Sequence, residues 1–242
     1  MAIYAIGDLH LPGHQEKPMN VFGDHWDRHF DVIRENWLSM VAPEDVVLIP
    51  GDISWAMQLS EARDDLMQIA ALPGRKLLLR GNHDYWWNSI SKVRALLPEN
   101  MYAIQNDALA LDGVVYCGTR GWNIPGEGQP ADPQDVKIFQ RELLRLEMSL
   151  QQAEKLAYGS LPVVVMMHYP PLYKDLLSTP FTEILERHGV RTVVFGHLHG
   201  AGIKVGFEGL LRGVEYHLVS CDALHFSLRR IEKVFPQELK QI

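Results

Sequence analysis

Residues 77–87, LLLRGNHDYWW, run from three leucines through Arg80 into Gly81-Asn82-His83-Asp84 and then into three aromatic residues. The leucines are typical of a strand that is buried on both faces. Gly, Asn and Asp favour turns and helix starts, so a purely structural turn is one interpretation of the polar run. The other is that the strand delivers reactive groups at its carboxyl end, as strands of open α/β sheets do.

The composition is that of an ordinary globular protein. The 242 residues are 47% hydrophobic and 22% charged, which is enough for a sizeable core, and we expect one domain over residues 1–242. Thirty acidic residues against 23 basic ones give a net charge of −7, and no dense run of Lys or Arg occurs. Nucleic acid is therefore not an expected partner.

Neither a membrane segment nor a disulfide framework is expected. No apolar run approaches the roughly 18 residues that cross a bilayer, and the start, MAIYAIGDLH, is typical of a first strand and not of a signal peptide. Cys117 and Cys221 are too few for a disulfide framework or a Cys-rich zinc site. We expect a cytoplasmic protein in a reducing compartment, with no membrane partner.

Short apolar runs alternate with helical patterns along the chain. The runs that predict buried strands are 2–6, 45–49, 76–80, 162–167 and 191–195. Apolar residues spaced three and four apart predict an amphipathic helix over 24–41. An Asp-Gly pair predicts a hairpin over 107–117, and the segments from 203 onward predict antiparallel strands. We therefore expect an α/β protein with mixed parallel and antiparallel pairing.

A second helix is predicted over 134–158, where apolar residues again recur at spacings of three and four. Its apolar stripe is narrow. Two interpretations stay open for this helix: it packs on the surface of the domain, or it forms the seam of a homodimer or binds a partner helix.

Potential ligands follow every predicted buried strand. The segments are Gly7-Asp8-Leu9-His10, Gly51-Asp52, Gly81-Asn82-His83-Asp84, His168 and Gly196-His197-Leu198-His199-Gly200. Each alone is a common turn fragment, but the carboxyl ends of parallel strands would bring all of them to one rim. Imidazole and oxygen donors without thiolates suit Mn, Fe or Zn, in sufficient number for two ions that share one carboxylate. Two ions about 3.5–4 Å apart clamp a phosphoryl group for in-line displacement.

Together these motifs resemble those of the calcineurin-like metallophosphoesterases over nearly the whole chain. The resemblance implies a four-layer αββα sandwich of two mixed β-sheets flanked by helices. The metal ligands that it implies are Asp8, His10 and His199 at one ion, Asn82, His168 and His197 at the other, and Asp52 between them. It further implies that His83 protonates the leaving oxygen and that Asp84 orients the imidazole of His83.

The predicted function is a dinuclear-metal-dependent phosphohydrolase. It would cleave a small phosphomonoester or phosphodiester by in-line attack of a metal-bound hydroxide. Two alternatives stay open: a noncatalytic protein-binding scaffold on the same fold, and a nucleotide-directed phosphodiesterase or nuclease. The complete ligand set argues against the scaffold, and the acidic balance argues against a nuclease.

Substrate contacts and the remaining histidines are harder to assign. The Gly- and Pro-rich segment 118–134 predicts a functional lid, with Arg120 and Trp122 as candidate substrate contacts. His14 and His225 lie in predicted loops that could approach the rim. The histidines expected to be structural or solvated are His25, His29, His188 and His217.

Overall fold

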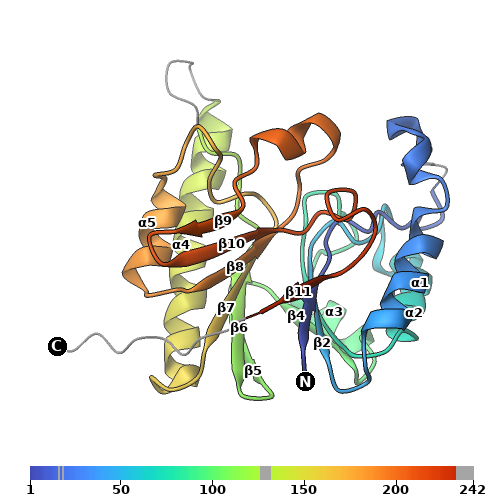
Figure 1. Ribbon diagram of the computed structural model, residues 1–242, viewed down its shortest axis with the longest axis horizontal. Coiled ribbons are helices and arrows are strands. Elements are labelled where there is room, and N and C mark those ends of the chain that lie inside the picture. Colours follow the sequence, from blue (N-terminus) through green and yellow to red (C-terminus); the bar gives the residue numbers. More distant parts are fainter. Residues whose placement is uncertain (16, 18, 126–131, 233–242) are drawn as a thin grey trace.

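Two β-sheets lie face to face, and helices cover the outer face of each sheet (Figure 1). The structure is a computed structural model that describes residues 1–15, 17, 19–125 and 132–232. Buried apolar residues form three clusters, one between the sheets and one between each sheet and its helices. The expected four-layer sandwich is therefore confirmed.

The first sheet has five strands in the order β11-β1-β2-β3-β4. Strands β1 to β4 are parallel, and β11 pairs antiparallel with β1 at the edge. The strands are β1 Ile3–Ala5, β2 Val46–Pro50, β3 Arg75–Leu79, β4 Met101–Ile104 and β11 Arg229–Ile231. The predicted runs at β1, β2 and β3 are correct to within one residue at each end, because both faces of these strands are buried.

The second sheet has six strands in the order β5-β6-β7-β8-β10-β9. Its four central strands are parallel, and β5 and β9 pair antiparallel at the two edges. The strands are β5 Ala108–Leu111, β6 Val114–Thr119, β7 Val163–Met167, β8 Thr192–Phe195, β9 Gly209–Leu211 and β10 Val214–Leu218. The predicted hairpin is present, and its turn residues Asp112 and Gly113 have φ values of 52° and 80°, as a type I′ turn requires.

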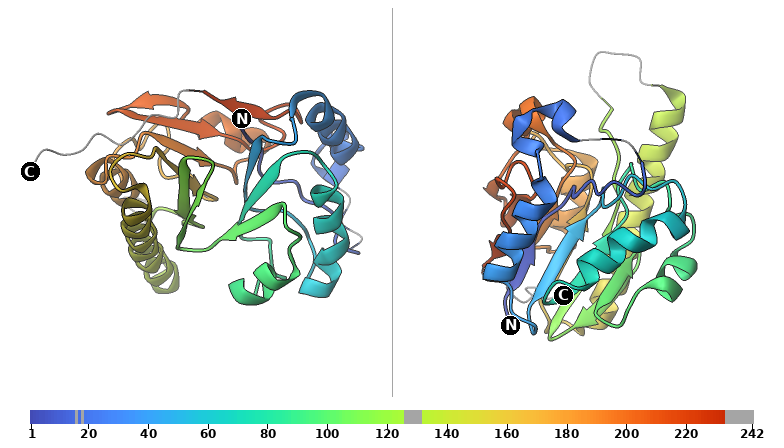
Figure 2. Two further views of the ribbon diagram at one scale, coloured as in Figure 1. Left: turned by 90° about the horizontal axis from the view of Figure 1, so that it is seen from below. Right: turned by 90° about the vertical axis from the view of Figure 1, so that its right-hand side faces the viewer.

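The helices divide between the two outer faces, as the view from below in Figure 2 shows. The helices on the first sheet are α1 His29–Met40, α2 Leu59–Ala70 and α3 Ile90–Leu96, and those on the second are α4 Pro133–Ala157 and α5 Pro180–Arg187. Three short 3₁₀ helices are η1 Met19–Phe22, η2 Asp24–Trp26 and η3 Gly200–Val205. Within the described residues, no helix is both long enough and apolar enough to span a bilayer.

Helix α4 packs its apolar stripe on the second sheet. Phe139, Leu146 and Leu150 are buried in the cluster that this helix forms with β6 and β7. The carboxylate of Asp132 accepts the backbone N–H of Gln134 at 2.7 Å and so caps the helix start. The stripe therefore serves the core of this chain, and a homodimer through the helix stays a prediction.

Three expectations about local structure are wrong. The helix predicted over 24–41 is broken, because Arg28 adopts a left-handed φ of 52° between η2 and α1. The first segment predicted as a strand, 203–209, instead begins with the last three residues of the 3₁₀ helix η3, which is too short to leave a periodic pattern. The next segment, β10, pairs in parallel with β8 and antiparallel only with β9.

A buried lysine in β3 allows a test of the packing. Lys76 is fully buried, and its ammonium group donates to the carbonyl oxygens of Ala70 and Leu72 at the end of α2. Burial lowers the pKa of Lys76 to about 8. Because an exposed lysine titrates near 10.4, the unfolded chain binds more protons between roughly pH 8 and 10, and stability rises with pH there.

We expect the free energy of unfolding of the wild type, relative to that of Lys76→Met, to rise by about 1–3 kcal/mol between roughly pH 8 and 10. Urea denaturation across that range measures this difference. Lys155→Met, at an exposed position on α4, is the matched control and should give a difference independent of pH. A flat difference for Lys76 would mean that its ammonium group is not desolvated.

Candidate metal centre

The five polar segments meet at one edge of the sandwich, but on two sheets and not on the single rim that we expected. Strands β1, β2 and β3 of the first sheet and β7 and β8 of the second end there. Backbone hydrogen bonds join the segments: Asp8 N–H donates to Gly51 O at 2.9 Å, and Gly196 N–H donates to His168 O at 3.1 Å. The sheets themselves are joined at Gly7, whose N–H donates to Val219 O at 2.6 Å.

A first cluster of ligand atoms comes from Asp8, His10 and His199, which all lie within 4.8 Å of one another. Nε2 of His10 is 3.2 Å from Nε2 of His199. Nε2 of His199 is also 3.6 Å from Oδ1 of Asp8. Two nitrogens and a carboxylate oxygen thus face one common point.

A second cluster comes from Asp52, His168 and His197, again within 4.8 Å. Nε2 of His168 is 3.3 Å from Nδ1 of His197 and 2.6 Å from Oδ1 of Asn82. Asn82 therefore adds an amide oxygen to this cluster. The two clusters group the predicted ligands in the way that the family resemblance implies.

Asp52 lies between the two clusters. Its Oδ2 is 3.9 Å from Nε2 of His10 in the first cluster and 3.5 Å from Nε2 of His168 in the second. Its other oxygen accepts the backbone N–H of His83 at 2.8 Å, which holds the carboxylate in place. One carboxylate oxygen is thus within reach of both clusters.

Four of the predicted ligands have backbone conformations that residues other than glycine rarely adopt. The φ values of Asp8, His10, Asp52 and His197 are 59°, 45°, 51° and 73°. Residues in the left-handed region cost about 1–3 kcal/mol each and gather at functional sites. Two segments each bring alternate side chains to the centre in this way, Asp8 with His10 and His197 with His199.

Two glycines allow the close approach of the carboxylates. A Cβ on Gly81 would lie 2.1 Å from Oδ1 of Asp52, and a Cβ on Gly196 would lie 2.4 Å from Oδ2 of Asp8. Any side chain at either position would displace a predicted ligand.

Two ligand imidazoles are oriented by groups behind them. Nδ1 of His168 is 3.0 Å from the carbonyl oxygen of Pro50, and Nδ1 of His199 is 2.9 Å from Oδ1 of Asp222. Such partners leave Nε2 of each ring available for a metal. Asp222 was not among the predicted site residues, although it follows β10 and the strand-end pattern would have identified it.

The charges at the centre fit metal ions. Burial raises the pKa of Asp52 well above its usual value, and the nearby Asp84 and Asp8 carboxylates raise it further. Burial lowers the pKa of His10 well below its usual value and that of His197 to about 3. Neutral imidazoles and crowded carboxylates are what a bound cation stabilises, and nitrogen and oxygen donors suit Mn, Fe or Zn.

His199 differs from the other imidazoles. Burial disfavours its charged form, but Asp8 and Asp222 outweigh that effect and raise the pKa of His199 to about 10. The carboxylates therefore favour a positive charge at its Nε2, and a metal bound there would replace a proton.

His83 lies beside the two clusters and not within them. Its Nε2 is 4.0 Å from Oδ2 of Asp52, and its side chain is 35% exposed. Its ring packs on Trp55 at a centroid distance of 4.5 Å, and Trp55 also stacks on His10 at 4.9 Å. Burial and the nearby His168 lower the pKa of His83 to about 4. Trp55, which the sequence analysis missed, fixes a ligand and the candidate acid together.

Asp84 does not orient His83, and that expectation is wrong. Its two oxygens accept five N–H groups at 2.7–3.2 Å, those of the Asp52, Ile53, Ser54 and Gly81 backbone and of the Trp86 indole. Nδ1 of His83 is buried with no hydrogen-bond partner among the described residues. The fully buried carboxylate of Asp84 instead holds the loop that carries Asp52.

The candidate substrate contacts lie next to the second cluster. Cζ of Arg120 is 4.6 Å from the ring centroid of Trp122, and the Trp122 ring is 5.2 Å from that of Tyr169. The Tyr169 ring lies 4.1 Å from that of the ligand His197. Residues 126–131 of the predicted lid 118–134 are outside the described residues, so the lid stays a prediction.

Histidines outside the motifs have other contacts. Nε2 of His14 is 3.1 Å from Oδ2 of Asp64 at the surface. Nε2 of His29 is 2.9 Å from the carbonyl oxygen of Leu9, so this residue is structural. His225 is exposed.

Both cysteines are free and buried. Burial raises the pKa of Cys117 to about 12, and Sγ of Cys221 lies 3.0 Å from the carbonyl oxygen of Asp8. Neither thiol has the low pKa of a nucleophile.

Two solved structures share this fold. One is a protein of unknown function from Aquifex aeolicus, with 18% identity, a TM-score of 0.50 and 95% of each chain covered. The other is the phosphopantetheinyl hydrolase of Mycobacterium tuberculosis, with 16% identity, a TM-score of 0.56, and 96% of this chain and 95% of that chain covered. No curated protein sequence matched.

The family comparison is more specific than the likeness of folds. The model described as calcineurin-like phosphoesterase matches residues 1–201, which include all seven predicted ligands. The chain therefore belongs to the calcineurin-like phosphoesterase family of metal-dependent hydrolases.

Proposed function

We propose that the protein is a dinuclear-metal phosphohydrolase that cleaves a small phosphomonoester or phosphodiester. The observation that carries the proposal is the position of Asp52, with one oxygen within 3.9 Å of His10 Nε2 and 3.5 Å of His168 Nε2. When bound, two such ions activate a water nucleophile and neutralise charge on the phosphoryl group. Asp8, His10 and His199 would hold one ion, and Asn82, His168 and His197 the other.

His83 is the proposed proton donor to the leaving oxygen. Its partial exposure lets a substrate reach the ring, and its Nε2 faces the carboxylate shared by the two clusters. The imidazole is neutral near pH 7 in the free chain, because its pKa is about 4. A phosphate dianion beside the ring would favour the protonated form. Trp55 holds the ring in that position.

The alternatives have less support. A noncatalytic scaffold has no need for the strained backbone of Asp8, His10, Asp52 and His197. A nuclease needs a cationic track for the nucleic acid backbone, and the net charge of −7 opposes one. The two buried free cysteines are consistent with a reducing, cytoplasmic environment.

The first test is metal removal and restoration. We expect the chelated protein to be inactive and added Mn²⁺ to restore hydrolysis, because the proposed nucleophile is a water molecule that the ions would activate. A panel of alkyl and aryl monoesters and diesters, with a phosphopantetheine ester included because of the shared fold, measures both the activity and its class. Absence of turnover on the whole panel by metal-loaded protein would favour the scaffold.

The second test concerns the shared carboxylate. Asp52→Asn removes a negative charge that both ions would use, so it should lower the occupancy of both, whereas His10→Ala should empty mainly one site. Elemental analysis of metal per chain measures the difference. Asp64→Asn, which changes an exposed carboxylate on α2, is the control and should keep both ions. Two ions per chain and normal activity in Asp52→Asn would exclude the bridging role.

The third test separates His83 from the metal ligands. His83→Ala should keep both ions yet slow hydrolysis by about 10²–10⁴-fold, the usual contribution of a positioned acid. The loss should be larger for alkyl esters than for p-nitrophenyl esters, because an aryl oxide leaves without a proton. Steady-state kinetics on both ester types, with His14→Ala as the control, measures this ratio. Equal losses would assign His83 to phosphate binding.

A further inference from the structure

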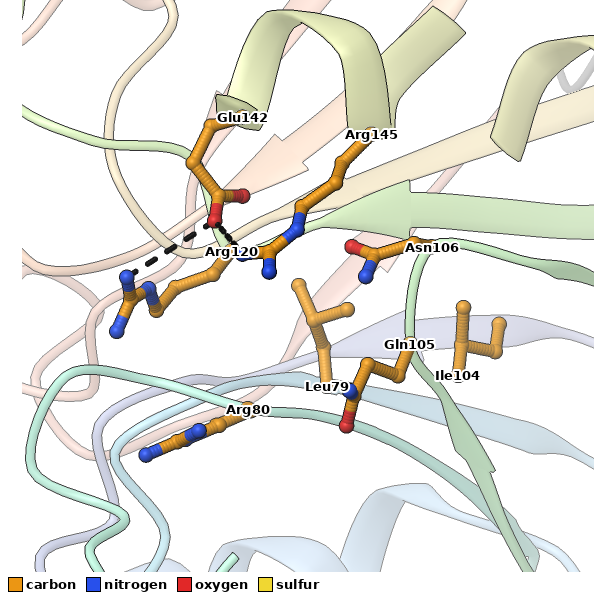
Figure 3. Close-up of a pocket in the computed structure, with 8 residues that line it drawn as sticks. All are labelled: Leu79, Arg80, Ile104, Gln105, Asn106, Arg120, Glu142 and Arg145. Carbon is orange, nitrogen blue, oxygen red and sulfur yellow. Dashed lines mark hydrogen bonds and ion pairs between the residues drawn. The ribbon is translucent and has the colours of Figure 1, made fainter. Parts of the chain in front are cut away.

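A cavity of about 90 Å³ lies between the two sheets and α4 (Figure 3). One water molecule requires roughly 10–15 Å³ measured in this way, so the cavity has room for a larger group. Its lining is polar except for two apolar side chains, and consists of Leu79, Arg80, Ile104, Gln105, Asn106, Arg120, Glu142 and Arg145.

Three guanidinium groups line this cavity, and Glu142 is the only carboxylate among its lining residues. Glu142 is fully buried and lies 2.5 Å from Arg145 Nη1 and 3.9 Å from Arg120 Nη2. Its oxygens also accept the hydroxyl of Thr119 and, at 3.2 Å, the backbone N–H of Gly121. The acceptor capacity of Glu142 is therefore largely used, and the charged side chains that line the cavity sum to +2.

Arg80 is the group without a partner. Its Nε is buried and has no hydrogen-bond partner among the described residues. In Figure 3, Arg80 and Arg120 extend in the same direction, and no interaction joins Arg80 to Glu142. Arg80 and Arg120 thus place like charges in one cavity, and their mutual repulsion has an energetic cost. A bound anion would remove that cost.

The cavity is connected to the proposed reaction site through the backbone. Arg80 lies two residues before the predicted ligand Asn82. The carbonyl oxygen of Arg120 accepts the backbone N–H of His168 at 3.1 Å and that of Tyr169 at 2.9 Å. An elongated substrate with its scissile phosphate at the metal centre could therefore place its far end among the arginines.

We propose that this cavity is a second anion subsite, formed by Arg80, Arg120 and Arg145, that binds a non-scissile phosphate group of the substrate. The inference rests on the proposed function, and it names the substrate class as small molecules with two phosphate groups. Guanidinium forks bind phosphate oxygens in a bidentate manner, and a lining with a charge sum of +2 matches a phosphate dianion better than a carboxylate.

Binding without turnover gives the first arm of the test. Alkane bisphosphonates with three to six carbons between the phosphorus atoms, and the matching alkyl monophosphonates, are titrated into metal-loaded protein by calorimetry. The best bisphosphonate should bind about 10–100-fold more tightly than its monophosphonate, the range for hydrogen bonds to charged groups. The affinity of an ω-carboxyalkyl phosphonate of the same length should exceed that of the monophosphonate by a smaller factor.

The variants Arg80→Gln and Arg145→Gln should each reduce this bisphosphonate preference by about tenfold or more. Arg63→Gln, at an exposed position on α2, should retain it. The ratio of the two affinities is the measurement, so changes in folding or metal loading that affect both ligands cancel. Two variants are used because Arg145→Gln removes an ion pair of Glu142, whereas Arg80→Gln leaves the ion pairs of Glu142 intact.

The second arm compares the hydrolysis of alkanediol bisphosphates with that of alkyl monophosphates. In the wild type, kcat/KM should be higher for the bisphosphates, and Arg80→Gln and Arg145→Gln should each reduce this preference. A wild type with no preference at any chain length, or variants that retain it, would overturn the subsite. If the ω-carboxyalkyl phosphonate bound as tightly as the bisphosphonate, the assignment of the subsite to phosphate would be overturned. If the bisphosphonate preference depends on the arginines but no ester is hydrolysed, the subsite stands and the proposed function fails.

Discussion

Three buried carboxylates at the junction of the two sheets determine how the rest of the structure is arranged. Asp8, Asp52 and Asp84 are 0%, 2% and 0% exposed, and a buried charge is tolerated only when hydrogen bonds or opposite charges satisfy it. Asp84 accepts hydrogen bonds from five N–H groups, so its carboxylate has a structural role. Asp52 accepts one backbone N–H and leaves its other oxygen facing imidazoles. That incomplete satisfaction is what makes the junction a metal site.

Hydrogen bonds in the surrounding sandwich offset the local strain of this arrangement. Left-handed turns at four ligands and the carboxylates packed against Gly81 and Gly196 are unfavourable locally. Backbone hydrogen bonds hold these turns together within each sheet, between Asp8 and Gly51 in the first and between Gly196 and His168 in the second. Each segment is thus fixed by its neighbours and not by its own conformational preference.

The sequence predicted those features that a local pattern of residues determines by itself. Buried parallel strands require continuous apolar runs, so β1, β2 and β3 were predictable, and the ligands were visible at their ends. Contacts between residues that are distant in the sequence could not be predicted in this way. The role of Asp84 as a cap for the Asp52 loop depends on backbone groups about 30 residues away, a proximity that no local pattern encodes. The division of the strand ends between two sheets was likewise hidden, because apolar runs do not specify which strands pair.

The placement of positive charge explains how an acidic protein could select its substrate. The chain has a net charge of −7, so its overall field opposes the approach of a long polyanion such as a nucleic acid. In our proposal, the positive charge that favours phosphate lies at the metal centre and in the cavity of about 90 Å³ that three arginines line. A small anion can enter both and gains from short-range contacts that the net charge does not cancel. An extended backbone would meet the repulsive field along most of its length and could place only one group in the cavity. Selection for small phosphate esters would then follow from the distribution of charge and not from its sum.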